Sequence, residues 1–361
     1  MIFPKLFIPG PTPVAEDTLR AMSQPQVGHR TPEFSELFTI VTTGLEKVLG
    51  ANKVFLFSNP ATGVWEAAVR NTVKKRALNL VNGAFAAKWH TLTQACGLPC
   101  DALNKEWGLA IHPEDVDRAL ATGKYDVVTL VHNETSTGVM SPLEDIAGLM
   151  AGKYPDIFLH VDAVSSMAGV EIRVDDWRLD TCFASVQKAW ALPAGFTVCA
   201  VSDRVIERSK ELPHKGYYLD LEVLDKFYRK QQTPSTPSLP HMYGLQKILA
   251  DIERETPAGR YARHQRMAQT ARDWARDHGQ VLYPEVGYAS PTLTAVRNVQ
   301  GWDLQAIYDA LEHEGYRMDR GYGKLRGEVF RIAHMGAVMP GDLDRYLAAF
   351  DGVLAAMGVP A

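Results

Sequence analysis

Residues 157–166 read IFLHVDAVSS, and this stretch decides the expected fold. An apolar run ends abruptly in Asp162, and small and hydroxylated residues follow. A carboxylate at the end of a buried strand is costly unless a cation or a strong hydrogen-bond donor meets it. In open α/β sheets, ligands bind at the carboxyl ends of the strands. Asp162 is therefore a candidate ligand-binding acid, although an aspartate that caps a structural turn fits the sequence equally well.

Short runs with the composition of β-strands recur along the first two thirds of the chain. Besides residues 157–162 they cover residues 54–58, 77–82, 127–132 and 197–202. Helical stretches such as 64–73 and 142–150 lie between most of them. This alternation predicts βαβ units, so we expect an α/β fold with a mostly parallel sheet that helices cover on both faces.

A longer helix is expected at residues 32–49, where apolar residues repeat at helical spacing. Thr31 can cap its start, because a threonine hydroxyl accepts hydrogen bonds from the first free N–H groups of a helix. Pro32 suits the first turn and Gly50 ends the helix.

Changes in composition along the chain suggest its division into domains. Residues 1–14 are rich in proline, which predicts an extended arm. From about residue 241 charged helical sequence dominates: residues 252–279 read mostly as amphipathic helix, and TLTAVRNV (292–299) reads as a strand. We therefore expect an arm at residues 1–14, a large domain at 15–255 and a smaller C-terminal α+β domain at 256–361.

The overall composition excludes several classes of protein. The chain has 361 residues, 46% of them hydrophobic, and a formal net charge of −4, which argues against wholesale binding of nucleic acid or membranes. Its four cysteines are too few to stabilise a chain of this length through disulfide bonds, and they are expected to be reduced. Neither a signal peptide, nor a long apolar span, nor metal-ligand spacing is evident, so we expect a cytoplasmic enzyme without a metal.

A lysine follows a second strand-like run in FASVQKAWALPAGF, residues 183–196. Lys188 stands among apolar and small residues with no neighbouring acid in the sequence. Burial lowers the pKa of a lysine, and the uncharged amine is a nucleophile for carbonyl groups. A surface lysine whose stem covers apolar neighbours fits the same sequence.

A third strand end, in FLFSNPATGVWEAAV (residues 55–69), runs through Asn-Pro-Ala-Thr-Gly into a helix. The free N–H groups of a helix N-terminus, small residues and a threonine hydroxyl together make a good phosphate site. An ordinary capped turn fits this segment as well. Taken together, however, a phosphate site, an acid at a strand end and a reactive lysine are what pyridoxal 5′-phosphate requires of a protein.

The chain also resembles a known family. The segments PGPTPV, GHRTPEF, VHNETSTGV, HVDAVSS, SVQKAWALPAG, TPSTPS and GKLRGEVFRIAHMG, which run in the same order from about residue 7 to 336, are similar to class V aminotransferases of fold type I. The resemblance is strongest to the serine–glyoxylate, alanine–glyoxylate and serine–pyruvate aminotransferases. It implies a large domain with a mostly parallel sheet of the seven-stranded type and pyridoxal 5′-phosphate as the cofactor.

This resemblance assigns roles around the cofactor ring. Lys188 would form the Schiff base with the cofactor and move the proton at the substrate Cα. Asp162 would pair with the pyridine nitrogen, and Val164 would pack under the ring. Phe85 matches a position where many relatives place a tryptophan over the other face of the ring. Thr135 would form a hydrogen bond near the phenolic oxygen.

The resemblance also implies which residues bind the phosphate. Ala61 and Thr62 would contribute a backbone N–H and a hydroxyl, with Gln187 beside the lysine. Thr236 matches a position that reaches the phosphate from the neighbouring subunit. Thr233 stands where some relatives have a tyrosine that touches the phosphate, so the resemblance does not carry that contact over to this chain.

For the substrate, Arg331 matches the arginine that holds the substrate carboxylate through a planar, bidentate contact. A salt-bridged arginine is the structural alternative. Pro9 and Gly10 of the arm would line the substrate entrance, and residues 322–324 would form a nearby loop. Residues 29 and 30 fit a structural role and a place at the rim of the site equally well.

The function implied is transamination from a small donor, serine or alanine, to a 2-oxo acid such as glyoxylate or pyruvate, in a ping-pong cycle. Aspartate as the donor and a β-elimination lyase of the same fold stay open. A desulfurase is disfavoured because no cysteine follows Cys199. The extended arm and Thr236 predict a homodimer whose active sites are shared between subunits.

Overall fold

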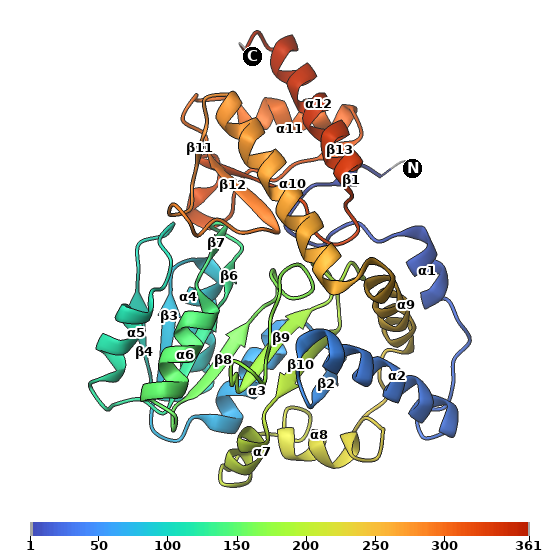
Figure 1. Ribbon diagram of the computed structural model, residues 1–361, viewed down its shortest axis with the longest axis vertical. Coiled ribbons are helices and arrows are strands. Elements are labelled where there is room, and N and C mark those ends of the chain that lie inside the picture. The colour runs from blue at the N-terminus through green and yellow to red at the C-terminus, as the bar shows by residue number, and fades with distance from the viewer. Residues whose placement is uncertain (1–2, 360–361) are drawn as a thin grey trace.

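A seven-stranded sheet forms the centre of the larger part of the molecule in the computed structural model, which describes residues 3–359 (Figure 1). Its strands lie in the order β2 (Val54–Phe57), β10 (Thr197–Val201), β9 (Thr181–Ser185), β8 (Phe158–Asp162), β5 (Val127–Val131), β3 (Ala77–Val81) and β4 (Cys100–Asn104). All neighbours pair in parallel except β10, which is antiparallel to both β2 and β9. The α/β fold class predicted from the sequence is confirmed, with a mixed, mostly parallel sheet.

Both faces of this sheet are covered, which explains why its strands are almost continuously apolar. Successive residues of one strand enter different cores: Leu56 and Leu130 face one cluster, while Phe55 and Val131 face the other. On the first face lie α2 (Pro32–Leu49), α5 (Pro113–Leu120), α6 (Leu143–Lys153) and α9 (Leu239–Glu255). On the second face lie α3 (Ala61–Thr72), α4 (Ala84–Ala95), α7 (Asp203–Lys210) and α8 (Leu221–Tyr228). The short helix α1 (Glu16–Met22) packs on α9.

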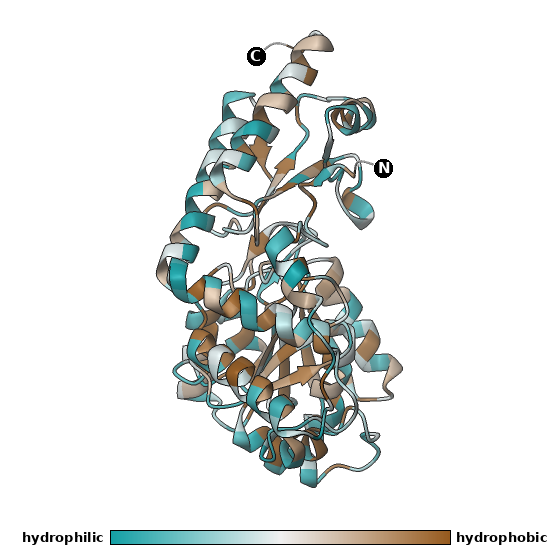
Figure 2. Cartoon of the chain, turned by 90° about the vertical axis from the view of Figure 1, so that its right-hand side faces the viewer, coloured by the Kyte–Doolittle hydropathy of each residue, from teal (hydrophilic) through white to brown (hydrophobic). Residues whose placement is uncertain are grey.

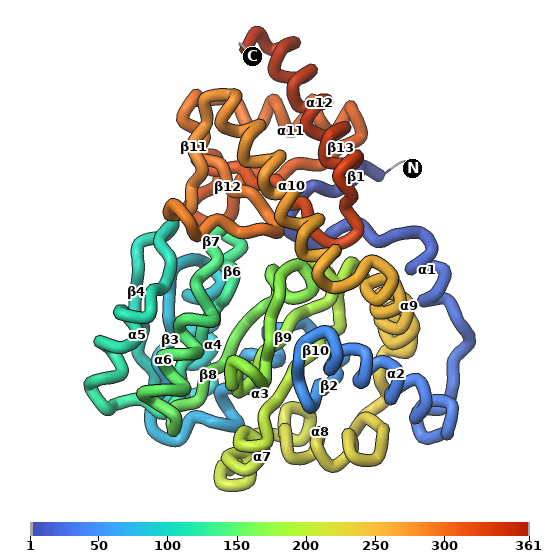
Figure 3. The backbone as a smooth tube through the Cα atoms, in the orientation of Figure 1, coloured from blue at the N-terminus to red at the C-terminus, as the bar shows by residue number. Residues whose placement is uncertain are grey.

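The C-terminal part, which lies above the large sheet in Figure 2, has its own hydrophobic core. A three-stranded antiparallel sheet of β11 (Val281–Leu282), β12 (Leu293–Arg297) and β14 (Val329–Ala333) packs with α10 (Pro257–Asp277), α11 (Leu304–His313) and α12 (Pro340–Ala356). The N-terminal arm joins this part: β1 (Lys5–Leu6) pairs in parallel with β13 (Tyr316–Arg317), and Phe7 is fully buried in the same core. Figure 3 shows the arm beside β13 before the chain descends to α1.

Several local expectations need correction. Strand β4 was not among the predicted strand runs; it is an edge strand that is only half-buried, so its composition carries a weak signal. The helix expected from residue 64 already begins at Ala61. The charged stretch 252–279 breaks at Thr256, which adopts a φ of +64° and separates α9 from α10. Thr31 does precede α2, but its side chain makes no capping hydrogen bond.

Candidate active site

A cavity of about 320 Å³ opens at the carboxyl ends of β2, β3, β5, β8 and β9. Parallel strands bring their ends, and the loops that follow them, to one edge of a sheet, so residues far apart in sequence meet there. The cavity is lined by Gly10, Pro11, Pro60, Ala61, Thr62, Trp65, Phe85, Lys88, Val131, Asn133, Thr135, Asp162, Val164, Ser185, Gln187, Lys188, Ala194 and Tyr322. Most residues predicted from the sequence to form the site are therefore brought together.

Lys188 lies just beyond β9 with its side chain buried in this cavity. Its Nζ donates a hydrogen bond to the carbonyl oxygen of Pro9 in the arm. The arm passes so closely that a Cβ on Gly10, whose φ is +117°, would lie 2.8 Å from the same nitrogen. Burial and the nearby charge of Arg331 lower the pKa of Lys188 to about 8, against the opposing effect of Asp162. About a tenth of this amine is thus uncharged at pH 7, far more than for an ordinary lysine, and the uncharged form is the nucleophile.

Asp162, at the end of β8, is also buried, and two hydrogen bonds hold its carboxylate. Trp65 Nε1 donates to Oδ2 at 2.6 Å, and the backbone N–H of Val164 donates to Oδ1 at 2.8 Å. Burial raises the pKa of Asp162 to about 6, and the two hydrogen bonds oppose that rise. A cation placed in the cavity would favour the ionised form further. Trp65, in α3, was missed in the sequence because it is 97 positions away from its partner.

The start of α3 forms the polar end of the cavity. The backbone N–H of Ala61 donates to Ser185 Oγ at 2.6 Å, and Ser185 Oγ lies 3.0 Å from Thr197 Oγ1. Thr62 and Gln187 line the same cavity. A helix N-terminus carries unpaired N–H groups and a partial positive charge, so this end suits an anion. Ser185, at the end of β9, is an additional candidate that the sequence did not single out.

Phe85 is held over the cavity by the start of α4. Glu134 is fully buried, and its Oε2 accepts hydrogen bonds from the backbone N–H groups of Phe85 at 3.1 Å and Ala86 at 3.0 Å. A Cβ on Gly83 would lie 2.2 Å from Glu134 Cγ, so only glycine fits there. Thr135, which follows Glu134, lines the cavity, and its hydroxyl forms a hydrogen bond with Ser165.

Arg331 lies in β14 and is only 4% exposed, and it does not line the cavity directly. Asp319 takes two of its N–H groups, from Nε at 2.7 Å and from Nη2 at 2.8 Å. Nη1 donates to the carbonyl oxygen of Thr135 at 2.7 Å. The ring of Tyr322 covers the guanidinium, with its centroid 5.8 Å from Cζ, and stacks on Phe85. Asp319 was not recognised in the sequence.

Thr236 is a predicted site residue that lies outside this arrangement. It is exposed in the loop between α8 and α9 and does not line the cavity around Lys188 of its own chain. Arg30 donates from Nη1 to the carbonyl oxygen of Thr233 at 2.8 Å, and the backbone N–H of Ser238 donates to Ser58 Oγ at 3.0 Å. These bonds hold the loop at the surface of the large part.

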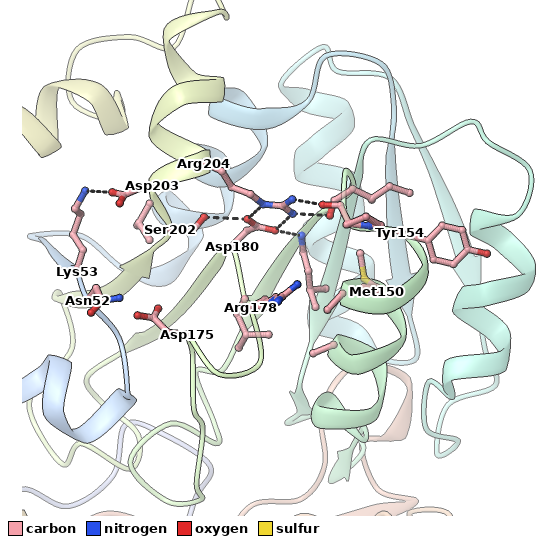
Figure 4. Close-up of a pocket in the computed structure, with 17 residues that line it drawn as sticks. Asn52, Lys53, Met150, Tyr154, Asp175, Arg178, Asp180, Ser202, Asp203 and Arg204 are labelled. Atoms are coloured by element: carbon pink, nitrogen blue, oxygen red, sulfur yellow. Dashed lines mark hydrogen bonds and ion pairs between the residues drawn. The ribbon is translucent and has the colours of Figure 1, made fainter.

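A second and larger cavity, of about 480 Å³, lies at the other edge of the sheet, by the amino ends of β8 and β9 (Figure 4). Its buried carboxylate, Asp180, accepts hydrogen bonds from Arg204 Nη2 at 2.6 Å and from the backbone N–H of Leu159 at 2.8 Å. Lys53 is paired with Asp203 at 2.8 Å. The hydrogen bonds of the Asp180 carboxylate are already supplied by the protein. We therefore interpret the Arg204–Asp180 ion pair as a contact that holds the strand ends together.

Neither a metal centre nor a membrane span is found in the part of the chain that the structure describes. Over residues 3–359, no group of three or more His, Cys, Asp or Glu side chains could hold a metal ion. Within the same range, no helix is both long enough and apolar enough to cross a bilayer.

The first cavity fits the cofactor expected from the sequence. It joins a buried amine, a buried carboxylate and a helix N-terminus in one space of suitable size for a small ligand. Among the described residues, Asn133 Oδ1 and Gln187 Oε1 are buried without a hydrogen-bond partner, and both residues line this cavity. Such orphaned polar atoms in a cavity indicate a polar ligand.

Comparisons with known proteins agree with this chemistry. A model of the family described as aminotransferase class-V matches residues 18–322. The chain is 31% identical to the L-aspartate–glyoxylate aminotransferase of Paracoccus denitrificans, over 98% of this chain and 92% of that protein. It is also 31% identical to a serine–glyoxylate aminotransferase of Methylorubrum extorquens, over 92% and 86% of the two chains.

Among solved structures, an alanine–glyoxylate aminotransferase from Nostoc sp. is similar to this chain with a TM-score of 0.92 and 29% identity. The match covers 98% of this chain and 96% of that one. The family match, the identities and the lysine–aspartate cavity lead to one conclusion. The chain belongs to the class V aminotransferases.

Proposed function

We propose that this chain transfers an amino group from serine or alanine to glyoxylate or pyruvate, with pyridoxal 5′-phosphate as its cofactor. The observation that carries the proposal is that Lys188 and Asp162, which are both buried, line one cavity with the N-terminus of α3. The names of the serine–glyoxylate and alanine–glyoxylate relatives support the choice of substrates.

When bound, the cofactor supplies an aldehyde for Schiff-base chemistry and a ring that withdraws electrons. The chain's own residues then have distinct tasks. Lys188, with its lowered pKa, would take up and return the proton at the donor Cα. Asp162 would hold a proton on the ring nitrogen, because an ionised carboxylate favours a neighbouring cation. Arg331 would orient the carboxylates of donor and acceptor.

Binding of the cofactor itself falls to three groups of residues. Ala61, Thr62 and Gln187 would hold the phosphate at the start of α3, and Thr135 would reach the ring. Phe85 and Val164, which both line the cavity, would enclose the ring between them. Pro9 and Gly10 would close the entrance, since the arm touches Lys188 in this structure.

A second candidate donor is aspartate. Lys88, one turn along α4 from Phe85, is exposed at the cavity, where its charge could meet a second carboxylate. The relative from Paracoccus denitrificans that is named for aspartate and glyoxylate supports this reading. Donor preference therefore needs a direct comparison.

We further propose a homodimer in which Thr236 completes the phosphate site of the partner subunit. Thr236 is exposed and lies away from its own chain's cavity, as a residue that serves a neighbouring subunit must.

The function is tested by incubating the cofactor-loaded protein with alanine or serine and glyoxylate, and by measuring glycine. Glycine should form together with the 2-oxo acid of the donor, and replacing glyoxylate with pyruvate should yield alanine from serine. A Lys188→Ala variant, prepared in the same way, should lose this turnover. If no donor yields glycine or alanine with either acceptor, the proposed function is wrong.

A further inference from the structure

The guanidinium of Arg331 is already paired with a carboxylate of the same chain, that of Asp319. Asp319 binds it side-on, with Nε at 2.7 Å and Nη2 at 2.8 Å, in the bidentate geometry that an arginine offers to any carboxylate. A guanidinium has five N–H groups. Asp319 takes two of them and the carbonyl oxygen of Thr135 takes a third, so one N–H on Nη1 and one on Nη2 stay available.

Asp319 is fixed in this place by its own backbone. The N–H of Arg331 donates to the carbonyl oxygen of Asp319 at 3.1 Å, within a β-bridge between the two residues. The N–H of Gly321 donates to Asp319 Oδ1 at 2.9 Å, which holds the side chain as well. The negative charge therefore stays beside Arg331 whatever enters the cavity.

The remaining face of the Arg331 guanidinium is covered by the ring of Tyr322, which is held differently from Asp319. Tyr322 is 43% exposed and follows Gly321, whose φ is +86°. Its ring stacks on Phe85, with centroids 5.2 Å apart, and its carbonyl oxygen accepts a hydrogen bond from the N–H of Leu325 at 3.2 Å. That bond fixes the turn but not the rotamer of the side chain. Tyr322 both lines the cavity and lies over the guanidinium, so we expect its side chain, rather than the fixed Asp319, to move when a carboxylate reaches the two free N–H groups.

We propose that Asp319 is a specificity-determining residue that restricts the amino donor to one carboxylate. This inference rests on the proposed function, in which Arg331 orients the donor. One carboxylate can occupy the end-on position formed by Nη1 and Nη2. In a dicarboxylic donor such as aspartate the second carboxylate lies only two carbons away, so it meets the fixed charge of Asp319 at short range. Like charges in a buried site repel strongly, and such repulsion is an effective way to exclude a competing substrate.

Lys88 also lines the cavity, and its positive charge would attract the second carboxylate of a dicarboxylic donor. It therefore opposes this exclusion. It is exposed to water, which screens its charge, whereas the side chain of Asp319 is only 17% exposed. The buried charge should therefore decide the preference between donors.

The test compares holoenzymes of the natural sequence, Asp319→Asn and Glu312→Gln, with glyoxylate as the acceptor and alanine or aspartate as the donor. Asparagine keeps an oxygen that can accept from Arg331 but removes the charge. Glu312, which pairs with Arg317 on the surface of the C-terminal part, loses the same charge without touching the site. The quantity measured is the ratio of kcat/KM for alanine to that for aspartate.

The natural sequence should favour alanine by at least about tenfold, and Asp319→Asn should lower this ratio by about tenfold or more, mostly through the KM for aspartate. Glu312→Gln should leave the ratio unchanged. A ratio in Asp319→Asn within about twofold of the natural one would overturn the inference. If the natural holoenzyme transaminates no donor at all, the proposed function has failed and the donor ratio has no meaning.

A binding measurement keeps the inference testable should the variant fail to fold or the natural protein fail to turn over. Propionate and succinate are titrated into the natural holoenzyme and followed through the cofactor's absorbance. Propionate, with one carboxylate, should bind more tightly than succinate, with two. Tighter binding of succinate would contradict the role of Asp319 independently of any activity.

Discussion

Asp162 is a buried acid whose ionised form is stabilised by neighbouring hydrogen-bond donors. Burial alone favours the protonated carboxyl, and the hydrogen bonds from Trp65 and Val164 favour the carboxylate. The raised pKa of about 6 still leaves Asp162 mostly ionised at neutral pH. A cationic ring nitrogen would lower that pKa further, so binding of the cofactor and ionisation of Asp162 support each other.

Trp65→Phe should weaken cofactor binding by about tenfold, since it removes a hydrogen bond to a charged group. Without the Nε1 donor at 2.6 Å, the pKa of Asp162 should rise above about 6, and the carboxylate should pair less well with the ring nitrogen. Equilibrium titration of the cofactor-free protein measures the affinity. Trp89→Phe is the matched control, because Trp89 stacks on Trp65 but makes no bond to Asp162. Equal losses in the two variants would contradict this role for Trp65.

The pKa of Lys188 predicts how cofactor capture depends on pH. Burial depresses this pKa to about 8 from 10.5, so the uncharged and reactive amine dominates above about pH 8. The rate at which the cofactor-free protein captures the aldehyde should thus rise about tenfold between pH 7 and 9 and level off there. A simple alkylamine measured in parallel corrects for ionisation of the aldehyde itself. A rate that keeps climbing toward pH 10.5 would show that the pKa of Lys188 is not depressed.

At the scale of elements, α4 begins where it does because Glu134 caps it from outside the helix. The buried carboxylate holds the N–H groups of Phe85 and Ala86, which places the Phe85 ring at the cavity. An anion at a helix N-terminus is favoured by the helix dipole as well as by these bonds. The position of one aromatic ring thus depends on a residue 49 positions away.

Gly83→Ala should destabilise the protein by about 2 kcal/mol, because the new Cβ would overlap Glu134 and disturb this cap. The backbone at Gly83 is extended, so the effect would come from packing rather than from backbone strain. Gly148→Ala is a matched control: it lies within α6 with no atom near its Cβ, and should stabilise by about 0.5–1 kcal/mol. Urea unfolding measures both changes. A Gly83→Ala protein as stable as the natural one would refute the tight packing.

The elements that the sequence predicts well are those whose signal is local. The helix expected at 32–49 has the observed bounds, and the five predicted strand runs all contain strands of the large sheet, because buried strands and amphipathic helices have their own periodicity. Lys188 and Asp162 stood out because a charge after an apolar run is unusual. Trp65, Ser185, Glu134 and Asp319 act only through partners elsewhere, and nothing in their neighbouring residues marks them.

At the scale of the whole molecule, the arm connects the C-terminal part to the cavity. Phe7 is buried in the C-terminal core, while three residues later Gly10 touches Lys188 of the large part. Thr12 continues this contact, with its hydroxyl donating to the carbonyl oxygen of Lys188 at 2.9 Å. A shift of the C-terminal part is therefore coupled to the entrance of the site through the arm.

The proposed sharing of sites between two subunits can be tested with hybrid dimers. Lys188→Ala lacks the reactive amine, and Thr236→Ala should bind the cofactor more weakly. In a mixed dimer, one site would lose both residues and the other would keep both. At a cofactor concentration that saturates an intact site but not a weakened one, the purified hybrid should hold about half the natural amount, at natural affinity. A hybrid that binds no better than Thr236→Ala would mean that Thr236 serves its own chain, and an active monomer in sedimentation would exclude sharing.

The account depends most on Lys188 as the amine that captures the cofactor's aldehyde. Reduction of the loaded protein with borohydride fixes the cofactor on the amine that holds it, and mass spectrometry of the digested chain then locates the modified residue. We predict that the modification lies on Lys188 alone and disappears in Lys188→Ala. Modification of another lysine, Lys88 at the cavity mouth for example, with Lys188 left unmodified would contradict the account.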